Sequence, residues 1–119
     1  MKKTIVIGAS EDPTRYAYKA TISLQKNNHE VIPVGITPGV INGIKIDTEK
    51  KLIPEVDTVT MYVNPKNQPF WYDYVINTKP KRVIFNPGAE NPEFENLLHK
   101  NNIEVTEACT LVLLSTGQY

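Results

Sequence analysis

The 119-residue sequence predicts an α/β fold in which a doubly wound parallel sheet of about five strands lies between two layers of helices. Three observations predict it. Short β-branched segments alternate with helix-forming segments at the spacing of β-α-β units. Gly, Pro and Asn follow the ends of these segments, where turns are expected. No internal repeat or low-complexity tract divides the chain, so we expect one domain over residues 1–119.

The first strand and helix set the pattern for the rest of the chain. Thr4–Ile7 is a β-branched run typical of a buried strand, and Gly8 ends it. Asp12 is the expected N-cap, and Pro13 the first residue, of a helix that runs to about Asn27. A turn followed by a helix N-terminus presents N–H groups to an anion.

The second crossover is expected to be irregular. A strand over Glu30–Val34 is followed by Gly35–Pro54, which is rich in Gly and Pro. This segment predicts a loop with a short extended piece and one helical turn near Glu49–Leu52. We expect it to form a flexible rim beside the ligand-binding end of the sheet.

The second half of the chain repeats the alternation of strands and helices. Strands are expected at Thr58–Val63, Arg82–Phe85 and Ile103–Thr106. One helix should begin near Gln68-Pro69 and pack its aromatic residues, Phe70, Trp71 and Tyr74, in the core. Stacking of these rings on a ligand is the alternative. Another begins at Asn91-Pro92-Glu93, and a last apolar helix covers Ala108–Leu114 and stops at Gly117.

Parallel strands place their carboxyl ends at one edge of the sheet, where ligands bind in such folds. Arg15 and Lys19 lie four residues apart on one helix face near this edge, and both could contact a phosphate. The four strand ends that gather there are Gly8-Ala9-Ser10, Pro33-Val34-Gly35, Val63-Asn64-Pro65 and Asn86-Pro87-Gly88.

The dinucleotide-binding fingerprint is incomplete. Of the three glycines in G-x-G-x-x-G only Gly8 is present, although Ala9 and Ser10 are small enough for a phosphate to approach the backbone. The second strand ends in apolar Val34 instead of the acid that binds a ribose in NAD enzymes. These features favour a Rossmann-like fold that binds a phosphate-bearing ligand other than NAD. A plain strand-to-helix turn is the alternative.

The composition argues against several classes of partner. Thirteen basic and thirteen acidic residues cancel, so nucleic acid and anionic membranes are poor candidates. No apolar run approaches the roughly 20 residues of a membrane span. The apolar run after Met1-Lys2-Lys3 is too short for a signal peptide. One cysteine excludes an internal disulfide and fits a reducing cytoplasm.

Few residues offer catalytic chemistry. If Thr106 caps the last helix, Cys109 lies in its first turn, where the helix dipole favours a reactive thiolate; the apolar neighbours favour an inert buried cysteine instead. Glu90 could act as a general base or bond to its own loop. His29 and His99 are isolated in the sequence, and no spacing suggests a metal site. We therefore assign no catalytic residue and no metal ligand.

Several stretches together resemble the CoA-binding domain family, in its small stand-alone bacterial form. The same module forms the nucleotide-binding half of the succinyl-CoA synthetase alpha subunit. The resemblance covers essentially the whole chain, and it is most specific in its last two stretches. The stretches are Gly8–Ser10, Arg15–Lys19, Val31–Val34, Val56–Asp57, Tyr62–Pro65, Pro80–Asn91 and Glu107–Gln118.

The resemblance implies a Rossmann-like sheet with CoA, or a related nucleotide, at the strand ends. By position, Gly8, Ala9 and Ser10 would line the phosphate turn, while Arg15 and Lys19 would face the phosphates. The chain departs from the family at Gly35–Pro38, where Asn-Pro is more usual. The adenine side would be bordered by Pro33 and Val34, and the rim along the pantetheine arm by Asn64, Pro65, Asn86, Pro87 and Gly88.

We expect a domain that binds CoA or an acyl-CoA without catalysing a reaction alone. It would carry CoA, sense it or present it to a protein partner that the sequence does not identify. Three alternatives remain open. One is an NAD(P)-type nucleotide sensor, and another is a small enzyme that acts on a CoA thioester or exchanges thiols through Cys109. The third is an interaction module whose pocket is vestigial.

Overall fold

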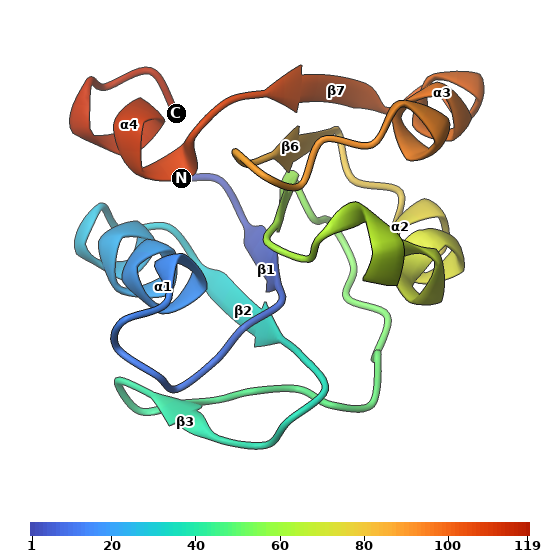
Figure 1. Cartoon of the computed structure of the whole chain (residues 1–119). Coiled ribbons are helices and arrows are strands. Elements are labelled where there is room, and N and C mark those ends of the chain that lie inside the picture. The colour runs from blue at the N-terminus through green and yellow to red at the C-terminus, as the bar shows by residue number, and fades with distance from the viewer.

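A computed structural model describes residues 1–119 and shows one five-stranded sheet in the order β2-β1-β5-β6-β7 (Figure 1). Every pairing in this sheet is parallel. The order reverses beside β1, because the chain moves from β1 outward to β2 and then returns to the other side of β1 for β5. The strands are β1 (Thr4–Ile7), β2 (Val31–Val34), β5 (Thr58–Met61), β6 (Arg82–Phe85) and β7 (Glu104–Glu107).

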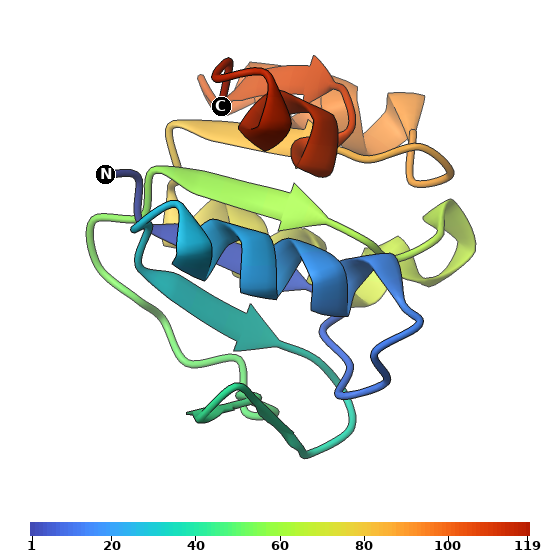
Figure 2. The same ribbon diagram turned by 90° about the vertical axis from the view of Figure 1, so that its left-hand side faces the viewer.

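Helices cover both faces of the sheet, so the predicted Rossmann-like three-layer α/β fold is confirmed. Helices α1 and α4 lie together on one face (Figure 2), and η1, α2 and α3 lie on the other (Figure 1). The helices are α1 (Tyr16–Lys26), the 3-10 helix η1 (Pro65–Trp71), α2 (Tyr72–Thr78), α3 (Pro92–Lys100) and α4 (Thr110–Ser115). No helix has both the length and the apolar character that crossing a membrane requires.

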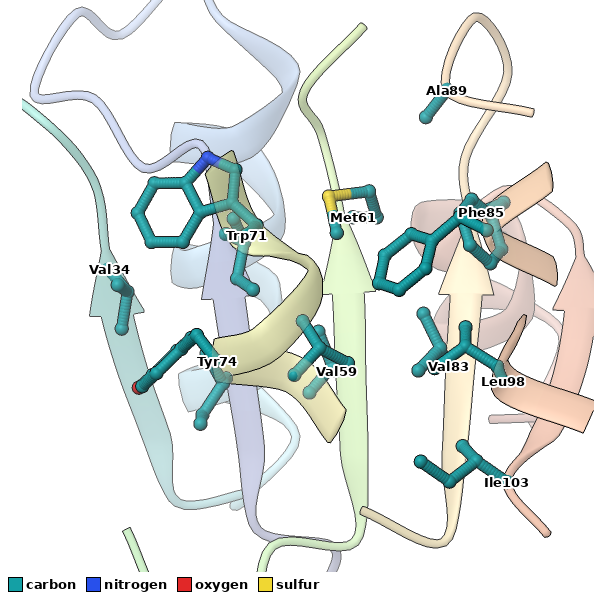
Figure 3. Packing of buried hydrophobic residues seen from close by; sticks show 14 of the residues in the cluster. Val34, Val59, Met61, Trp71, Tyr74, Val83, Phe85, Ala89, Leu98 and Ile103 are labelled. Carbon is teal, nitrogen blue, oxygen red and sulfur yellow. The ribbon is translucent and has the colours of Figure 1, made fainter. Parts of the chain in front are cut away.

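The pleat of β1 explains why the sheet has a core on each face. Ile5 and Ile7 point to one side and Val6 to the other, and all three are fully buried. The larger core packs the strands against α2 and α3 (Figure 3). Its members include Val34, Val59, Met61, Trp71, Tyr74, Val75, Val83, Phe85, Phe94 and Leu98. The smaller core joins Val6 and Val31 to Ala17, Leu24 and Leu114.

Helix α1 begins later than the sequence predicts. Its N-cap is Arg15, and the expected cap at Asp12 and first position at Pro13 are wrong. The Asp12 carboxylate instead accepts hydrogen bonds from the backbone N–H and the hydroxyl of Thr14, at 3.0 and 2.7 Å. This local turn competes with helix capping. Residues 8–15 therefore form a longer loop between β1 and α1 than expected.

The irregular crossover contains a small hairpin made of β3 (Val40–Ile41) and β4 (Ile44–Lys45). Asn42 and Gly43 form its two-residue turn, both with positive φ (46° and 86°), which matches the strand twist. The short extended piece is thus confirmed, but the helical turn near Glu49–Leu52 is wrong.

Asp47 explains why no helical turn forms after the hairpin. Its carboxylate accepts hydrogen bonds from the N–H groups of Glu49 and Lys51, at 2.9 and 3.1 Å. Its backbone pairs with the end of β2, because its N–H donates to Pro33 O and its carbonyl accepts from Gly35 N–H. The crossover is therefore anchored to the sheet as it leaves the hairpin.

Two other helices begin at residues other than those predicted, η1 earlier in the chain and α4 later. Helix η1 begins at Pro65, not near Gln68-Pro69, and its N-cap Asn64 accepts from Asn67 N–H at 3.1 Å. Helix α4 begins at Thr110, while Thr106 lies in β7, so the expected Thr106 cap is wrong.

The predicted start of α3 is confirmed. Pro92 is its first residue, and Asn91 Oδ1 accepts from Phe94 N–H at 3.2 Å. An asparagine side chain accepts well at this position, and proline at the first helical position lacks only an N–H that would be unpaired in any case.

Candidate ligand-binding site

A cleft of about 700 Å³ opens at the carboxyl ends of β1 and β5, beside the N-terminus of α1. It lies where the strand order reverses, which is the usual ligand site in open α/β sheets. Its volume is within the range of small-molecule and cofactor sites. The lining residues are Gly8, Ala9, Ser10, Arg15, Ile36, Tyr62, Val63, Asn64, Lys66, Asn67, Pro69, Phe70 and Trp71.

A second hollow of about 330 Å³ adjoins the cleft. The two share Gly8, Arg15 and the segment Tyr62–Asn64. The second hollow extends to Pro87–Ala89, in the turn that follows β6, and to the first turn of α1. Together they give an elongated groove across three strand ends.

Gly8 is required at the floor of both hollows. Its φ is +94°, and a Cβ there would lie 3.1 Å from the carbonyl carbon of Tyr62 and 3.2 Å from Val63 Cγ2. Any side chain would therefore be strained and crowded. The N–H groups of Gly8 and Ala9 both donate to Val34 O at 3.0 Å, so the turn is tied to β2 and these two N–H groups are occupied.

The free backbone donors lie further along the same loop. The N–H groups of Ser10, Tyr16 and Ala17 meet no acceptor in the protein, and Arg15 caps α1 without a side-chain hydrogen bond. At a helix N-terminus such groups carry the positive end of the helix dipole. An anion beside Ser10 and the start of α1 would therefore meet these free N–H groups and the positive end of the helix dipole.

Arg15 is available to such an anion. Its side chain is 72% exposed, and its one ion pair, with Asp12, is long at 3.9 Å. The hydrogen bonds from the Thr14 backbone and hydroxyl, more than Arg15, hold the pKa of Asp12 below its ordinary value. Thr14 thus satisfies the Asp12 carboxylate. If Arg15 left Asp12 to bind a ligand, the fold would lose little stability.

The groove is cationic although the whole chain has no net charge. Arg15 and Lys66 line the larger cleft, Lys66 makes no ion pair, and no carboxylate lines either hollow. Arg15 is the N-cap of α1 and Lys66 lies in η1, and these two helices lie on opposite faces of the sheet. Unpaired charge of one sign attracts an anionic ligand.

The η1 side also supplies an apolar wall. Phe70 is 61% exposed at the cleft, whereas Trp71 behind it is 3% exposed. The two rings meet edge to face, with centroids 5.2 Å apart. Ile36, which follows the end of β2, is also exposed and lines the same cleft. The cleft therefore offers both cationic and apolar surface.

The structure brings most of the sequence-predicted residues to this groove. The larger cleft is lined by Gly8, Ala9, Ser10, Arg15 and Asn64. The adjoining hollow is lined by Pro87 and Gly88, together with residues of the first set.

Five predicted residues do not line it. Lys19 borders a separate shallow hollow on α1, with Nζ 5.2 Å from the Tyr16 ring centroid. Pro33 and Val34 are buried in β2, and Pro65 begins η1. Asn86 is 2% exposed and fully occupied.

The amide of Asn86 joins three elements of the fold. Its Nδ2 donates to Thr60 Oγ1 at 2.7 Å and to Met61 O at 3.0 Å. Its Oδ1 accepts from Thr110 N–H, at the start of α4, at 2.9 Å. In this structure the side chain therefore holds the end of β6 to β5 and α4.

Sequence reasoning missed Ile36, Lys66 and Asn67 as lining residues, and for Phe70 it preferred the core to the alternative of a ligand contact. Lys66 and Asn67 could have been found from Asn64-Pro65, which has the same helix-start pattern as Asn91-Pro92. Phe70 was expected in the core; that is wrong, while the burial of Trp71 and Tyr74 is confirmed.

The candidate catalytic groups Cys109 and Glu90 lie outside the larger cleft, and Tyr62, which lines it, offers no exposed hydroxyl. Cys109 is half-buried at the N-cap of α4 and lines neither hollow. Glu90 Oε1 accepts from Gly88 N–H at 2.8 Å within its own loop. The Tyr62 hydroxyl is buried without a hydrogen-bond partner, and burial raises its pKa, so it stays neutral.

A family model described as a CoA binding domain matches residues 2–115. The chain belongs to this CoA-binding family. The resemblance predicted from the sequence motifs is thereby confirmed. The comparison with curated proteins gave no match.

Solved structures share the fold of this CoA-binding domain. A crystal structure of an uncharacterized protein is 50% identical, with a TM-score of 0.98 over 100% of this chain and 98% of that chain. The protein called cell-free ID.343 from Thermus thermophilus is 25% identical, with a TM-score of 0.85 over 99% and 91% of the two chains.

A larger enzyme contains the same fold as one part. The dinucleotide forming acetyl-coenzyme A synthetase 1 of Ca. Korarchaeum cryptofilum, in complex with phosphate and ADP, is 19% identical with a TM-score of 0.71. The match covers 89% of this chain and 25% of that chain, and at this identity it shows the fold alone.

Proposed function

We propose that this protein is a single-domain module that binds CoA or an acyl-CoA in the cleft and does not catalyse a reaction alone. The observation that carries the proposal is the cleft at the strand reversal, lined by Arg15 and Lys66 and by no carboxylate. CoA brings a diphosphate and a further phosphate, which suit two cations and a helix N-terminus. Its adenine suits the apolar wall formed by Phe70 and Ile36.

The phosphate end is assigned to the start of α1. There Ser10 and Arg15 line the cleft, and Tyr16 and Ala17, the first residues of α1, line the adjoining hollow. Gly8 and Ala9 let the ligand approach the backbone, and Lys66 offers a second charge from η1. The pantetheine arm is assigned to the groove that runs from Asn64 towards Pro87 and Gly88. Pro33 and Val34 support this floor from β2. The predicted ligand contact of Asn86 stays a prediction, and that of Lys19 is tested by Lys19→Ala below.

The binding role is supported by what surrounds the ligand space. Neither hollow is lined by a histidine, a cysteine or a carboxylate that could serve as a general base or nucleophile. A role in presenting CoA to a protein partner is part of the proposal. The same fold occurs as about a quarter of an acetyl-CoA synthetase chain. The proposal includes the bacterial cytoplasm as the setting, in keeping with the single cysteine and the resemblance to small bacterial members.

Calorimetric titration of the reduced protein with CoA, acetyl-CoA, ADP and NAD tests the proposal. We expect micromolar binding of CoA or acetyl-CoA that is tighter than that of ADP and NAD. Tighter binding of NAD would favour a nucleotide sensor, and no binding of any of the four would favour an interaction module. Acetyl-CoA turnover that disappears in Cys109→Ala would show an enzyme instead.

A further inference from the structure

The two faces of the Phe70 ring have different surroundings. Lys50 Nζ lies 3.4 Å from the ring centroid and so occupies one face. The same ammonium donates a hydrogen bond to the carbonyl oxygen of Phe70. Phe70 is nevertheless 61% exposed, and it lines the cleft. One face of the ring is therefore covered by a cation while the ring stays open to the ligand space.

The edge of the ring is fixed as well. Trp71 meets Phe70 at an interplanar angle of 88°, and Lys50 Nζ is 5.1 Å from the Trp71 ring centroid. Trp71 itself is buried in the larger core. Phe70 thus contacts the Lys50 ammonium at one face and the buried Trp71 ring at its edge, which limits the rotation of an otherwise exposed ring.

The backbone of Lys50 is strained in the conformation that makes this contact. Its φ is +51°, in the left-handed region that lysine rarely adopts. The Asp47 carboxylate bonds to the N–H groups on either side of Lys50, and the Tyr74 hydroxyl donates to Lys51 O at 2.9 Å. Strain that is held in place by several bonds often marks a functional position.

The segment from Asp47 to Lys50 positions both exposed apolar residues of the cleft, Ile36 and Phe70. Through its backbone, Asp47 is hydrogen-bonded to Pro33 and Gly35, immediately before Ile36. Through the ammonium of Lys50, the segment also contacts Phe70. Ile36 is 77% exposed, so two exposed apolar side chains border the cleft and one segment positions both.

We propose that Phe70, backed by Lys50, is a stacking platform for the adenine base of the ligand, with Lys50 as its positioning residue. The inference rests on the proposed function, because it assigns one part of a CoA-like ligand to one wall of the same cleft. A flat ring with one covered and one accessible face fits a planar base, since bases stack on aromatic rings regardless of their hydrogen-bonding edges. A flexible pantetheine arm needs no such flat, immobilised surface.

Three variants test the platform. Phe70→Leu keeps an apolar side chain but removes the flat ring, and Phe70→Tyr restores it. Lys50→Met keeps the length of the side chain but removes the cation. Lys51→Met is the matched control, because Lys51 is exposed and its one ion pair is with Glu49. Titrations use CoA, ADP and phosphopantetheine, followed by calorimetry and by the emission of Trp71, the only tryptophan.

We expect Phe70→Leu to weaken both CoA and ADP at least about fivefold, as loss of one base stack does, and to leave phosphopantetheine unchanged. Phe70→Tyr should restore the affinity. Lys50→Met should weaken CoA and ADP by a smaller factor and shift the Trp71 emission, and Lys51→Met should do neither. Loss of phosphopantetheine binding with ADP unchanged would overturn the assignment, as would unchanged affinity for all three.

The same titrations separate this proposal from the proposed function. Whether the wild-type protein prefers CoA to ADP tests the function. Whether ADP affinity depends on Phe70 tests the platform. If ADP binds and CoA does not, the proposed function is wrong, and the ADP titrations of the Phe70 and Lys50 variants still test the stacking platform. If neither nucleotide binds, both proposals fall.

Discussion

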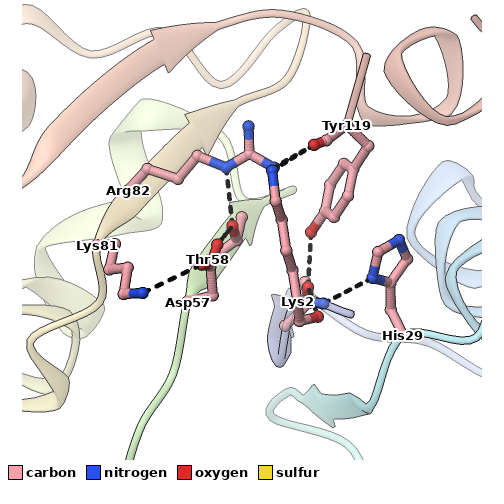
Figure 4. Close-up of polar contacts among 8 residues, drawn as sticks. Lys2, His29, Asp57, Thr58, Lys81, Arg82 and Tyr119 are labelled. Atoms are coloured by element: carbon pink, nitrogen blue, oxygen red, sulfur yellow. Dashed lines mark hydrogen bonds and ion pairs between the residues drawn. The ribbon is translucent and has the colours of Figure 1, made fainter. Parts of the chain in front are cut away.

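The two ends of the sheet use their polar side chains differently. At the amino end, Lys2, Arg82 and Tyr119 meet in a connected cluster (Figure 4). The Tyr119 hydroxyl lies 2.6 Å from Thr4 Oγ1, and Arg82 Nε donates to Thr58 Oγ1 at 2.8 Å. In the same cluster, Lys2 N–H donates to His29 Nδ1 at 2.9 Å and Lys81 pairs with Asp57 at 3.9 Å.

At the carboxyl end the charged groups are left largely without partners. Lys66 has no ion pair, and Arg15 has one long contact to an aspartate that Thr14 already satisfies. Groups that are paired inside the protein contribute to its stability, and groups left unpaired at a cleft are available to a ligand. One short sheet thus separates the two tasks between its ends, and substitutions can test that separation.

The largest effect is expected from Gly8→Ala at the cleft floor. Alanine at this position must adopt φ +94°, and its Cβ would lie 3.1 Å from the Tyr62 carbonyl carbon. We therefore expect a loss of about 3 kcal/mol in the free energy of unfolding, measured with urea. Gly88→Ala is the matched control, because its φ is +93° but no atom lies within 4 Å. It should cost about 1–2 kcal/mol. Equal losses would show that the floor is not tightly packed.

Arg15→Ala should separate binding from stability. We expect CoA affinity to fall by about 1.5–3 kcal/mol, the value of a charge-assisted hydrogen bond, with the free energy of unfolding changed by less than about 0.5 kcal/mol. Calorimetry and urea unfolding measure the two. Lys19→Ala, on the same helix but outside the groove, should have little effect on affinity. A similar loss in Lys19→Ala would extend the site along α1.

Tyr119→Phe tests the opposite end. It removes the hydroxyl that bonds to Thr4, and Thr4 keeps its other bond, to Lys2 O at 2.9 Å. We expect a loss of about 1 kcal/mol in the free energy of unfolding and no change in CoA affinity. An affinity change as large as that of Arg15→Ala would contradict the separation of the two ends.

The smallest effect is expected from the pH dependence of His29. Burial, followed by the positive N-terminus and Lys2, lowers its pKa below the ordinary 6.5. The folded protein therefore favours neutral His29, whose contribution is present above pH 6.5 and is lost as the pH falls through the lowered pKa. Urea unfolding between about pH 7.5 and 5 should show this decline, and it should be smaller in His29→Gln. His99→Gln, at an exposed position, should behave like the wild type.

Much of the fold could be predicted because its signals are local. The β-branched run Thr4–Ile7 and the cap at Asn91-Pro92 specify a strand and a helix start by themselves. The start of α1 could not be placed, because Asp12 satisfies its own turn as well as it could cap a helix. The hairpin turn at Asn42-Gly43 had a recognised signal, but its two-residue strands are too short to show alternation.

The candidate site was predictable where it follows a strand end and not where it depends on tertiary packing. Gly8, Ser10 and Arg15 come directly after β1, so the topology places them in the groove. Lys66 and Phe70 reach it because η1 is a 3-10 helix that begins at Asn64-Pro65, which rotates Phe70 out of the core. Lys50 lies outside any helix or strand, and Phe70 lies in η1, 20 residues further along the chain, so no sequence pattern indicates their contact.

The pairing of Asp47 with the end of β2 also bears on self-association. A five-stranded open sheet has two outer strands, whose unpaired N–H and C=O groups invite pairing with another chain. At β2, the bridge between Val34 and Asp47 covers part of that row with the protein's own backbone. At β7, the exposed carboxylates of Glu104 and Glu107 stand at the two ends of the strand and repel a second copy. Each border of the sheet is therefore protected against edge-to-edge aggregation, one by its own chain and the other by charge.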